Sequence, residues 1–455
     1  MRTNTSNGKL IPSIGFWGLL AMCVGLNIGG SLFALTSLAA GLSGPSLPIA
    51  MMISALPALL AVLPYSILTS SLPTTSATYR YAQMVHPTLA LVVMLSLGIT
   101  ILIGAQPLFG LAFGAFLRHI APVHPITVGV IVLTIFYIIN LLGINLTARI
   151  QIAMFCILMA ALVIYIVMGI PHVAAANFNP MYPMGAGGVF AAAGLLYTFC
   201  TGGFFVIDLG GEVIMARRIF PKVLLLGMVL VIVLYLLILV ISVGVVPWGW
   251  LKGKSLIHVA EQFMPGPVLV FFVIGGALTA CATTINVIFS IASRAVMVLA
   301  KEGLLPEVLG RVHPRFGTPH WGLTVGWLIC VAALVFIPSL MFFGSMLNLG
   351  LILAITAVAA AGLVLPSRYP AIFTNSSIKV PGWLLKAACI TIIAINVLIF
   401  FFFCAAIGKA SFVFFGIVLF SLAYAWVQRK KIQSLRKSLK TDPEKWFRNL
   451  RGENG

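Results

Sequence analysis

Residues 223–246 read VLLLGMVLVIVLYLLILVISVGVV and contain no charged side chain. An α-helix rises about 1.5 Å per residue, so about 20 apolar residues cross the hydrocarbon core of a bilayer. Polar and apolar residues do not alternate here, as they would in a half-buried strand. The stretch therefore predicts a membrane-spanning helix rather than a strand of a barrel.

Eleven further apolar runs resemble this one, and the whole chain is 61% apolar and only 8% charged. Soluble domains carry about a quarter charged residues. Inside hydrocarbon only helices and closed barrels satisfy their backbone groups. We therefore predict an all-α integral membrane protein, with one transmembrane domain over 1–427 and a basic cytoplasmic tail over 428–455. The twelve predicted spans are 14–40, 47–70, 89–117, 126–146, 150–170, 188–211, 223–246, 268–297, 322–337, 346–365, 384–407 and 411–427.

The net charge of +19 is distributed unevenly between the two sides of these spans. Of the 27 Lys and Arg residues, 23 fall on the side of the termini, and only Arg118, Lys252, Lys254 and Lys409 fall on the other side. Positive residues stay cytoplasmic in membrane proteins. We expect both termini in the cytoplasm of a multi-pass protein of the cell (inner) membrane, with the lipid bilayer and no nucleic acid as a partner.

Two spans carry a glycine pair near their middle, at 27–31 (NIGGS) and 200–204 (CTGGF). Each is the first span of a block of five spans, and the blocks cover about 14–170 and about 188–365. Because each block has an odd number of spans, the two blocks enter the membrane in opposite orientations. Glycine-interrupted spans at matching positions of two halves point to a transporter binding site. The alternative is close helix packing, which glycine pairs also serve. The two spans within about 384–427 lie outside this 5+5 inverted repeat.

Several loop sequences resemble one known family. They are 293–306 (SRAVMVLAKEGLLP), 311–319 (RVHPRFGTP), 72–81 (LPTTSATYRY) and the break at 25–33 (GLNIGGSLF). These stretches are similar to the amino acid–polyamine–organocation transporter superfamily, in its bacterial amino acid permease branch. The resemblance implies the leucine-transporter-type fold, with broken helices 1 and 6 and with helices 11 and 12 peripheral. It also implies a secondary active transporter of amino acids or related amines. Such a protein works by alternating access, with proton or sodium coupling or by exchange, and is not an enzyme.

By this resemblance, unpaired backbone groups at the two breaks bind the substrate. Its carboxylate would meet the N–H groups of Gly29, Gly30 and Ser31. Its amine would face carbonyls near Asn27 and Ile28, and near Phe199, Cys200 and Thr201, with Gly202 at the second break. Phe204 or Phe205 would form a gate over the substrate, although each is equally explained by ordinary packing.

Departures from the family pattern bear on the coupling ion. The first break reads Gly29-Gly30-Ser31 instead of Gly-Ser-Gly, and Leu158 stands where sodium-independent members often place a lysine. The hydroxyls of Thr283 and Thr284, with carbonyls of Gly25 and Ile28, would form an all-oxygen sodium site, which suits a hard cation. Alternatively, the threonines bond back to their own helix. The coupling ion, sodium or proton, is the only cofactor-like species expected.

Asp208 is the single acidic residue well inside a predicted span, where a charge costs about 2.5–3.5 kcal/mol and so suggests function. Three roles compete: binding a cationic substrate group, carrying a coupling proton, or accepting bonds from unwound backbone. The structural alternative is an ion pair with an arginine such as Arg217. An alternative function is therefore transport of a polyamine or other organic cation through Asp208, or a transport-like receptor.

Catalytic and metal-binding patterns are not found in the sequence. The seven histidines fall in loops or at span ends, and the seven cysteines form no C-x-x-C pair. We therefore predict no catalytic residues and no transition-metal site. The expected partner is a small-molecule substrate, and the oligomeric state is left open.

Overall fold

The computed structural model describes residues 12–441. Over this range the chain is helical, and its only β-type pairings are isolated bridges between Ile14 and Val213 and between Thr75 and Leu209. This agrees with the predicted all-α class, because a helix satisfies its own backbone groups within the bilayer.

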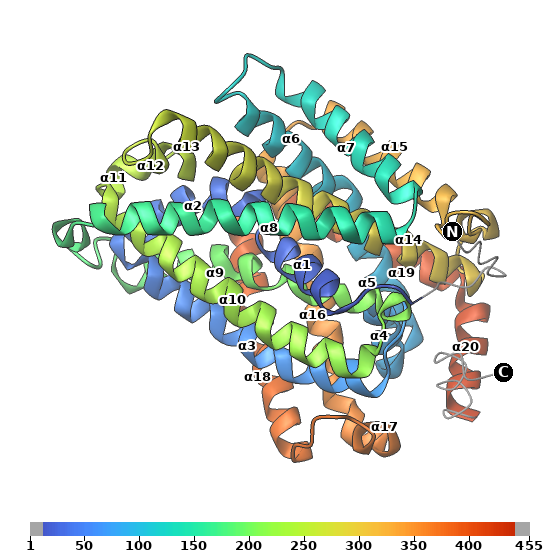
Figure 1. Ribbon diagram of the computed structural model, residues 1–455. Helices are drawn as coiled ribbons and strands as arrows, with labels where there is room; N and C mark the ends of the chain where they lie inside the picture. The colour runs from blue at the N-terminus through green and yellow to red at the C-terminus, as the bar shows by residue number, and fades with distance from the viewer. Residues whose placement is uncertain (1–11, 442–455) are drawn as a thin grey trace.

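Long helices form most of the bundle (Figure 1). They are α3 (Leu47–Ser71), α8 (Ile144–Gly169), α10 (Ala216–Val245), α14 (Thr279–Lys301), α16 (Leu340–Arg368), α18 (Gly382–Ile407) and α19 (Lys409–Val427). Helices of intermediate length are α1 (Phe16–Asn27), α2 (Gly30–Ser43), α5 (Pro87–Thr100), α6 (Gln106–Leu117), α7 (Pro125–Leu141), α9 (Gly185–Leu196), α15 (His320–Phe336) and α20 (Arg429–Thr441). Short helices are α4 (Ala77–Val85), α11 (Trp248–Leu251), α12 (Leu256–Ala260), α13 (Gly266–Phe271) and α17 (Pro370–Thr374).

Tighter and wider helical turns join these elements. The π-helical segments η2 (Ile101–Ala105) and η8 (Phe272–Leu278) continue α5 into α6 and α13 into α14. The 3₁₀ segments are η1 (Gly44–Ser46), η3 (Ile170–His172), η4 (Ala175–Phe178), η5 (Tyr197–Cys200), η6 (Gly202–Asp208), η7 (Gly210–Glu212) and η9 (Glu307–Gly310).

Within the described range, ten helical stretches are long and apolar enough to cross a membrane. Two shorter apolar helices, α7 and α15, lie where the fourth and ninth spans were predicted. The predicted boundary between the fourth and fifth spans was wrong. The chain turns at Gly143, with φ of +112°, and α8 already begins at Ile144. Glycine adopts this backbone conformation without the steric cost that other residues meet.

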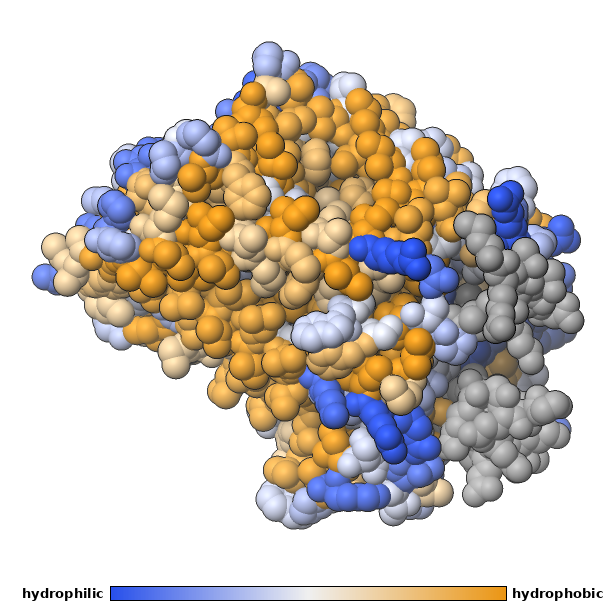
Figure 2. Space-filling view, viewed as in Figure 1, coloured by the Kyte–Doolittle hydropathy of each residue, from blue (hydrophilic) through white to orange (hydrophobic). Residues whose placement is uncertain are grey.

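The outer surface is apolar, as the bilayer requires. Figure 2 shows hydrophobic residues over most of the visible face, with hydrophilic residues at its edges and in a smaller group on its lower part. Large apolar side chains are strongly exposed, among them Phe336 at 82%, Phe412 at 75% and Trp383 at 71%. A soluble monomer rarely exposes so much contiguous apolar surface. The chain is therefore a multi-pass membrane protein.

In the interior, α1 packs against α8, α10 and α14, while α10 lies along α3 (Figure 1). The helix α20 covers part of the predicted basic tail and lies at the edge of the bundle, and residues 442–455 of that tail lie outside the described residues. Lys431 Nζ donates to the carbonyl of Gly303 at 2.6 Å, so this tail helix is joined to the loop that follows α14.

Candidate functional site

The first glycine pair separates α1 from α2. The N–H of Ile28 still donates to Val24 O at 2.8 Å, and the N–H of Gly29 donates to Asn27 O at 3.0 Å. The next helix begins at Gly30. The first N–H groups of an α-helix have no partner within it. Ser31 therefore presents its N–H group at this interruption, whereas the N–H of Gly29 is already used and the backbone of Gly30 hydrogen-bonds to the Cys281 side chain.

Space, rather than backbone conformation, explains both glycines of the pair. Gly29 has an extended backbone that any residue adopts, with φ of −93°. A Cβ added to it would lie 2.9 Å from Cε1 of Phe109 and 3.0 Å from Oγ1 of Thr284. A Cβ on Gly30 would overlap Sγ of Cys281. A larger side chain would push the interruption away from α6 and α14.

The second glycine pair lies in a long departure from α-helical geometry. After α9 ends at Leu196, the chain continues as the 3₁₀ turns η5, η6 and η7, and the α-helix resumes only at Ala216. A 3₁₀ turn pairs each N–H with a carbonyl three residues earlier and has poorer hydrogen-bond geometry than an α-helix. Backbone groups in this segment are therefore available for partners other than the helix itself.

The two interruptions contact one another directly. The N–H of Gly203 donates to Oδ1 of Asn27 at 2.8 Å, and a Cβ on Gly202 would overlap the carbonyl oxygen of Leu26. Tyr235 donates its hydroxyl to the carbonyl of Asn27 at 2.6 Å. Asn27 is 2% exposed, and its Nδ2 atom has no hydrogen-bond partner among the described residues.

A cavity of about 50 Å³ lies beside these interruptions, large enough for a few water molecules. Its walls come from α1, α2, the α5–α6 region, the second interruption, α14 and α16. They consist of Leu26, Asn27, Ser31, Leu35, Ile101, Leu108, Phe109, Thr198, Gly202, Phe205, Thr284, Ile288, Ile291, Gly344, Leu347, Asn348 and Leu351. These side chains are mostly apolar, a few are polar, and none is charged.

The predicted substrate residues divide into two groups. Those that line the cavity are Asn27, Ser31, Gly202 and Phe205. Those that do not are Ile28, Gly29, Gly30, Phe199, Cys200, Thr201, Phe204 and Asp208. Two of the aromatic residues in the second group pack instead against tyrosines. The ring of Phe204 lies 4.5 Å from that of Tyr65, and the ring of Phe199 lies 5.2 Å from that of Tyr235.

The predicted sodium residues are partly brought together. Thr284 Oγ1 donates to the carbonyl of Gly25 at 2.8 Å and to that of Ala280 at 3.1 Å. Thr283 Oγ1 donates to Ala280 O at 2.9 Å and lies 3.4 Å from Gly25 O. Both threonines therefore bond to their own helix and also contact α1. The oxygen atoms of Gly25, Thr283 and Thr284 are the kind that hard cations prefer.

Asp208 is buried away from the cavity and is bound to α4. Its carboxylate accepts the backbone N–H of Thr78 at 2.6 Å and the hydroxyl of Thr78 at 3.0 Å. Thr78 lies in the first turn of α4, where free N–H groups favour a carboxylate. The predicted alternative partner, Arg217, donates instead to the carbonyls of Ser70 and Asn375. Asp208 therefore joins the second interruption to α4 across a large sequence separation.

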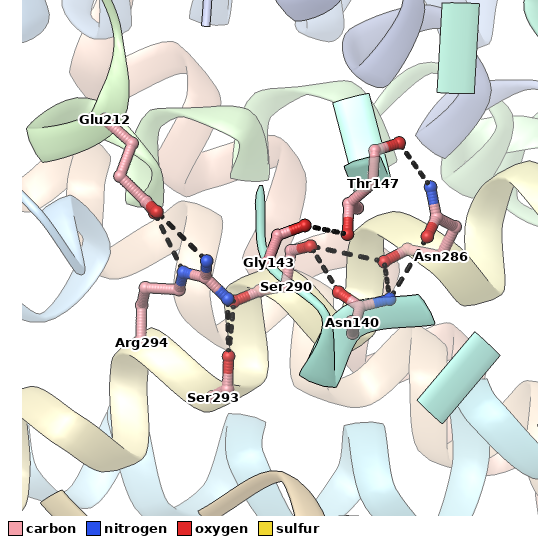
Figure 3. A network of polar contacts seen from close by, with 8 residues as sticks. All are labelled: Asn140, Gly143, Thr147, Glu212, Asn286, Ser290, Ser293 and Arg294. Atoms are coloured by element: carbon pink, nitrogen blue, oxygen red, sulfur yellow. Dashed lines mark hydrogen bonds and ion pairs between the residues drawn. The ribbon is translucent and has the colours of Figure 1, made fainter. Parts of the chain in front are cut away.

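A buried ion pair closes the far end of the second interruption (Figure 3). Arg294 Nε donates to Glu212 Oε2 at 2.8 Å, and its Nη2 donates to Oε1 at 3.0 Å. Both side chains are 1% exposed. The carbonyl of Glu212 also accepts the N–H groups of Ser13 and Ile14, just before α1. Sequence reasoning gave no sign of this pairing, because 82 residues separate its two members.

A chain of hydrogen bonds between uncharged side chains continues from this ion pair through the bundle (Figure 3). Ser290, whose carbonyl accepts from Arg294, donates its hydroxyl to Asn140 Oδ1 at 2.6 Å. Asn140 donates to Asn286 Oδ1 at 3.1 Å, and Asn286 donates to Gln151 Oε1 at 3.0 Å. At the end of this chain of hydrogen bonds, Gln151 donates to the carbonyl of Ala21 on α1 at 3.2 Å. The network thus ties α7, α8 and α14 to the helix before the first interruption.

Taken together, a membrane-embedded helical bundle and an internal cavity beside two joined helix interruptions define the class of multi-pass membrane proteins with a small-molecule site. Within the described residues, no group of three His, Cys, Asp or Glu side chains is arranged to hold a metal ion. Residues 14–427 match the family model described as amino acid permease, and the chain belongs to that family.

Three relatives show the range of this similarity. The branched-chain amino acid permease BcaP of Bacillus subtilis is 26% identical over 70% of this chain and 73% of its own length. The methylthioribose transporter of the same organism is 24% identical over 70% of this chain and 74% of its own. The chloroplastic cationic amino acid transporter 9 of Arabidopsis thaliana is 25% identical over 68% and 59%. These relatives are permeases and transporters, not enzymes.

Proposed function

We propose that the protein is a secondary active transporter that carries amino acids across the membrane by alternating access. The observation that carries this proposal is the contact between the two interruptions at the cavity wall, made by Gly203 and Asn27 at 2.8 Å. Family membership supports amino acids as the substrate class. The relatives' names alone do not select one, because they include branched-chain amino acids, cationic amino acids and methylthioribose.

Interrupted helices suit a zwitterion for electrostatic reasons. The N-terminus of α2 carries the positive end of a helix dipole together with the N–H group of Ser31, so it favours a carboxylate. The 3₁₀ turns after α9 offer carbonyl oxygens that favour an ammonium group. The carbonyl of Asn27 contributes little to this second role, because it already accepts from Tyr235.

The proposed architecture is the 5+5 inverted repeat, with about twelve spans, repeats over about 14–170 and about 188–365, and two peripheral helices. The positions of α1–α2 and of α9 to η7 at the start of the two halves support it. The excess of Lys and Arg on one side supports cytoplasmic termini in the cell membrane. Coupling to sodium through Gly25, Ile28, Thr283 and Thr284, coupling to protons, and exchange are all compatible with this architecture.

Transport of a polyamine or other organic cation through Asp208 is the weaker proposal. It would need the carboxylate to meet the substrate, yet the carboxylate hydrogen-bonds to Thr78 with both of its oxygens and does not line the cavity. We therefore retain amino acid transport as the single proposed function.

Counterflow in proteoliposomes tests this function. Vesicles loaded with one unlabelled amino acid should take up the same labelled amino acid transiently, without ATP. Gly30→Leu should abolish the uptake, because the new side chain collides with Cys281 at the start of α2. Gly416→Leu is the matched control, since a side chain there meets open space. Counterflow that is absent for every amino acid, or unchanged in Gly30→Leu, contradicts the proposal.

A further inference from the structure

The cavity contains no charge that could neutralise a charged substrate side chain. Its polar members are Asn27, Ser31, Thr198, Thr284 and Asn348, and the rest of its lining is apolar or glycine. The buried carboxylates of the described chain are engaged elsewhere. Asp208 is bonded to Thr78, Glu212 to Arg294, and Glu302 to Arg80 and Tyr79. Moving an ion from water into a site without an opposite charge has a large unfavourable free energy of desolvation.

Asn348 is the cavity residue that the sequence did not single out. It lies on α16, between Leu347 and Leu351 of the same wall, and it is 8% exposed. Its side-chain amide borders the cavity, on a wall of α16 whose other members are Gly344, Leu347 and Leu351. Asn348 therefore brings one neutral hydrogen-bonding group to an otherwise apolar wall.

Asn27 and Asn348 lie on different walls of the cavity. Asn27 ends α1 beside the free N–H group of Ser31 on α2, where a substrate's amino and carboxyl groups are expected. Asn348 belongs to α16, which packs against η2 and α6, the segments that contribute Ile101 and Leu108 to the cavity. A substrate anchored at the interruptions would therefore direct its side chain towards the wall that carries Asn348.

We infer that the site is selective for amino acids with uncharged, largely apolar side chains, and that Asn348 is the specificity-determining residue on the wall that faces the substrate side chain. This inference rests on the proposed function and adds the substrate class to it. The cavity offers apolar contacts to an aliphatic side chain. The one amide on this wall is neutral, so it cannot neutralise a charged substrate side chain.

Norleucine and lysine provide a matched pair of ligands, because lysine has the four-carbon side chain of norleucine with an ammonium group added to its terminal carbon. Binding to the purified full-length protein in detergent can be followed by thermal shift and isothermal titration calorimetry. We expect norleucine to bind at least about 100-fold more tightly than lysine, since each 1.4 kcal/mol of lost interaction is about tenfold in affinity. Equal binding of the two ligands overturns the inference.

Asn348→Asp should reduce the preference for norleucine over lysine by about tenfold or more, because it places a counter-charge beside the substrate side chain. Asn348→Leu should keep the preference, since it changes shape without adding charge. Asn375→Asp, at the exposed end of α17, makes the same chemical change outside the cavity and should have no effect. An Asn348→Asp protein that still binds norleucine but keeps the wild-type ratio overturns the role of Asn348.

The same experiment separates this inference from the proposed function. If no amino acid, lysine included, binds or supports counterflow, the proposed transport of amino acids fails and the inference fails with it. If lysine is exchanged but norleucine, leucine and alanine are not, amino acid transport stands and the selectivity is overturned. If lysine and norleucine are both bound and exchanged equally well, amino acid transport stands and only the selectivity is wrong.

Discussion

Removing the negative charge from the buried ion pair should destabilise the protein strongly. In Glu212→Gln, Arg294 keeps its contacts with the Ser290 carbonyl and the Ser293 hydroxyl, but it loses the carboxylate that accepts from two of its nitrogens. Both side chains are 1% exposed, so water cannot replace the lost charge. Breaking a buried pair by removing one partner costs about 3–5 kcal/mol.

This cost can be converted into a melting temperature. Unfolding entropy is about 2.1 cal/mol/K per residue, which for 455 residues amounts to roughly 1 kcal/mol/K. Glu212→Gln should therefore lower Tm by roughly 3–5 °C. Replacing both partners, as in Glu212→Gln with Arg294→Gln, should recover part of the loss, because no unpaired charge is then buried.

Differential scanning fluorimetry of the purified protein measures these shifts. Glu261→Gln is the control, since Glu261 is exposed just after α12 and its replacement should change stability by less than about 0.5 kcal/mol. A Glu212→Gln protein that melts with the wild type, or a double variant less stable than both single variants, would refute the reasoning.

Three further predictions concern other parts of the structure. Asp208→Asn should leave substrate selectivity unchanged but lower stability by about 1–2 kcal/mol, because it weakens the bonds to Thr78; altered selectivity for cationic substrates would contradict this. Gly203→Ala should impair substrate binding, since its Cβ would lie 2.7 Å from Cys23 O and overlap Asn27 Nδ2, whereas Gly194→Ala enters open space and should bind normally. The pKa of His119 is lowered from 6.5, first because the side chain is partly buried and second because His258 lies beside it, while the charge of Glu261 opposes the shift. The unfolded chain therefore binds more protons, so stability should fall as pH drops below about 6.5, and His119→Gln should flatten this decline in Tm. An equally steep decline in His119→Gln would count against the assignment.

Long apolar runs predicted the membrane class because a bilayer accepts an apolar exterior. The same property hid the boundary between α7 and α8. Residues 126–146 carry no charged side chain, so only Gly143 itself and the nearby Asn140 and Asn145 marked the turn. Helices that are apolar all round carry little periodicity from which to read their ends.

The glycine pairs at 27–31 and 200–204 were recognisable as possible interruptions because glycine is costly inside a helix. Their direct contact, through Gly203 and Asn27, depends on tertiary packing and could not be read from either segment. For the same reason the sequence did not reveal that Asp208 meets Thr78 or that Glu212 meets Arg294.

Asn348 could not be identified from its sequence neighbourhood. It is one of a few polar residues in a mainly apolar helix, and polar residues at such positions usually bond to a neighbouring helix, as Asn396 does with Tyr197 at 2.5 Å. Only the placement of α16 beside the cavity distinguishes Asn348 from Asn396.

Determining the structure with a saturating transported amino acid would show directly whether the two interrupted helices form the binding site. We expect the ligand in the cavity beside the two interruptions, with its carboxylate at the start of α2 and its side chain towards α16. Ligand bound elsewhere, or two continuous helices through residues 27–31 and 200–204 with no space between them, would contradict this expectation.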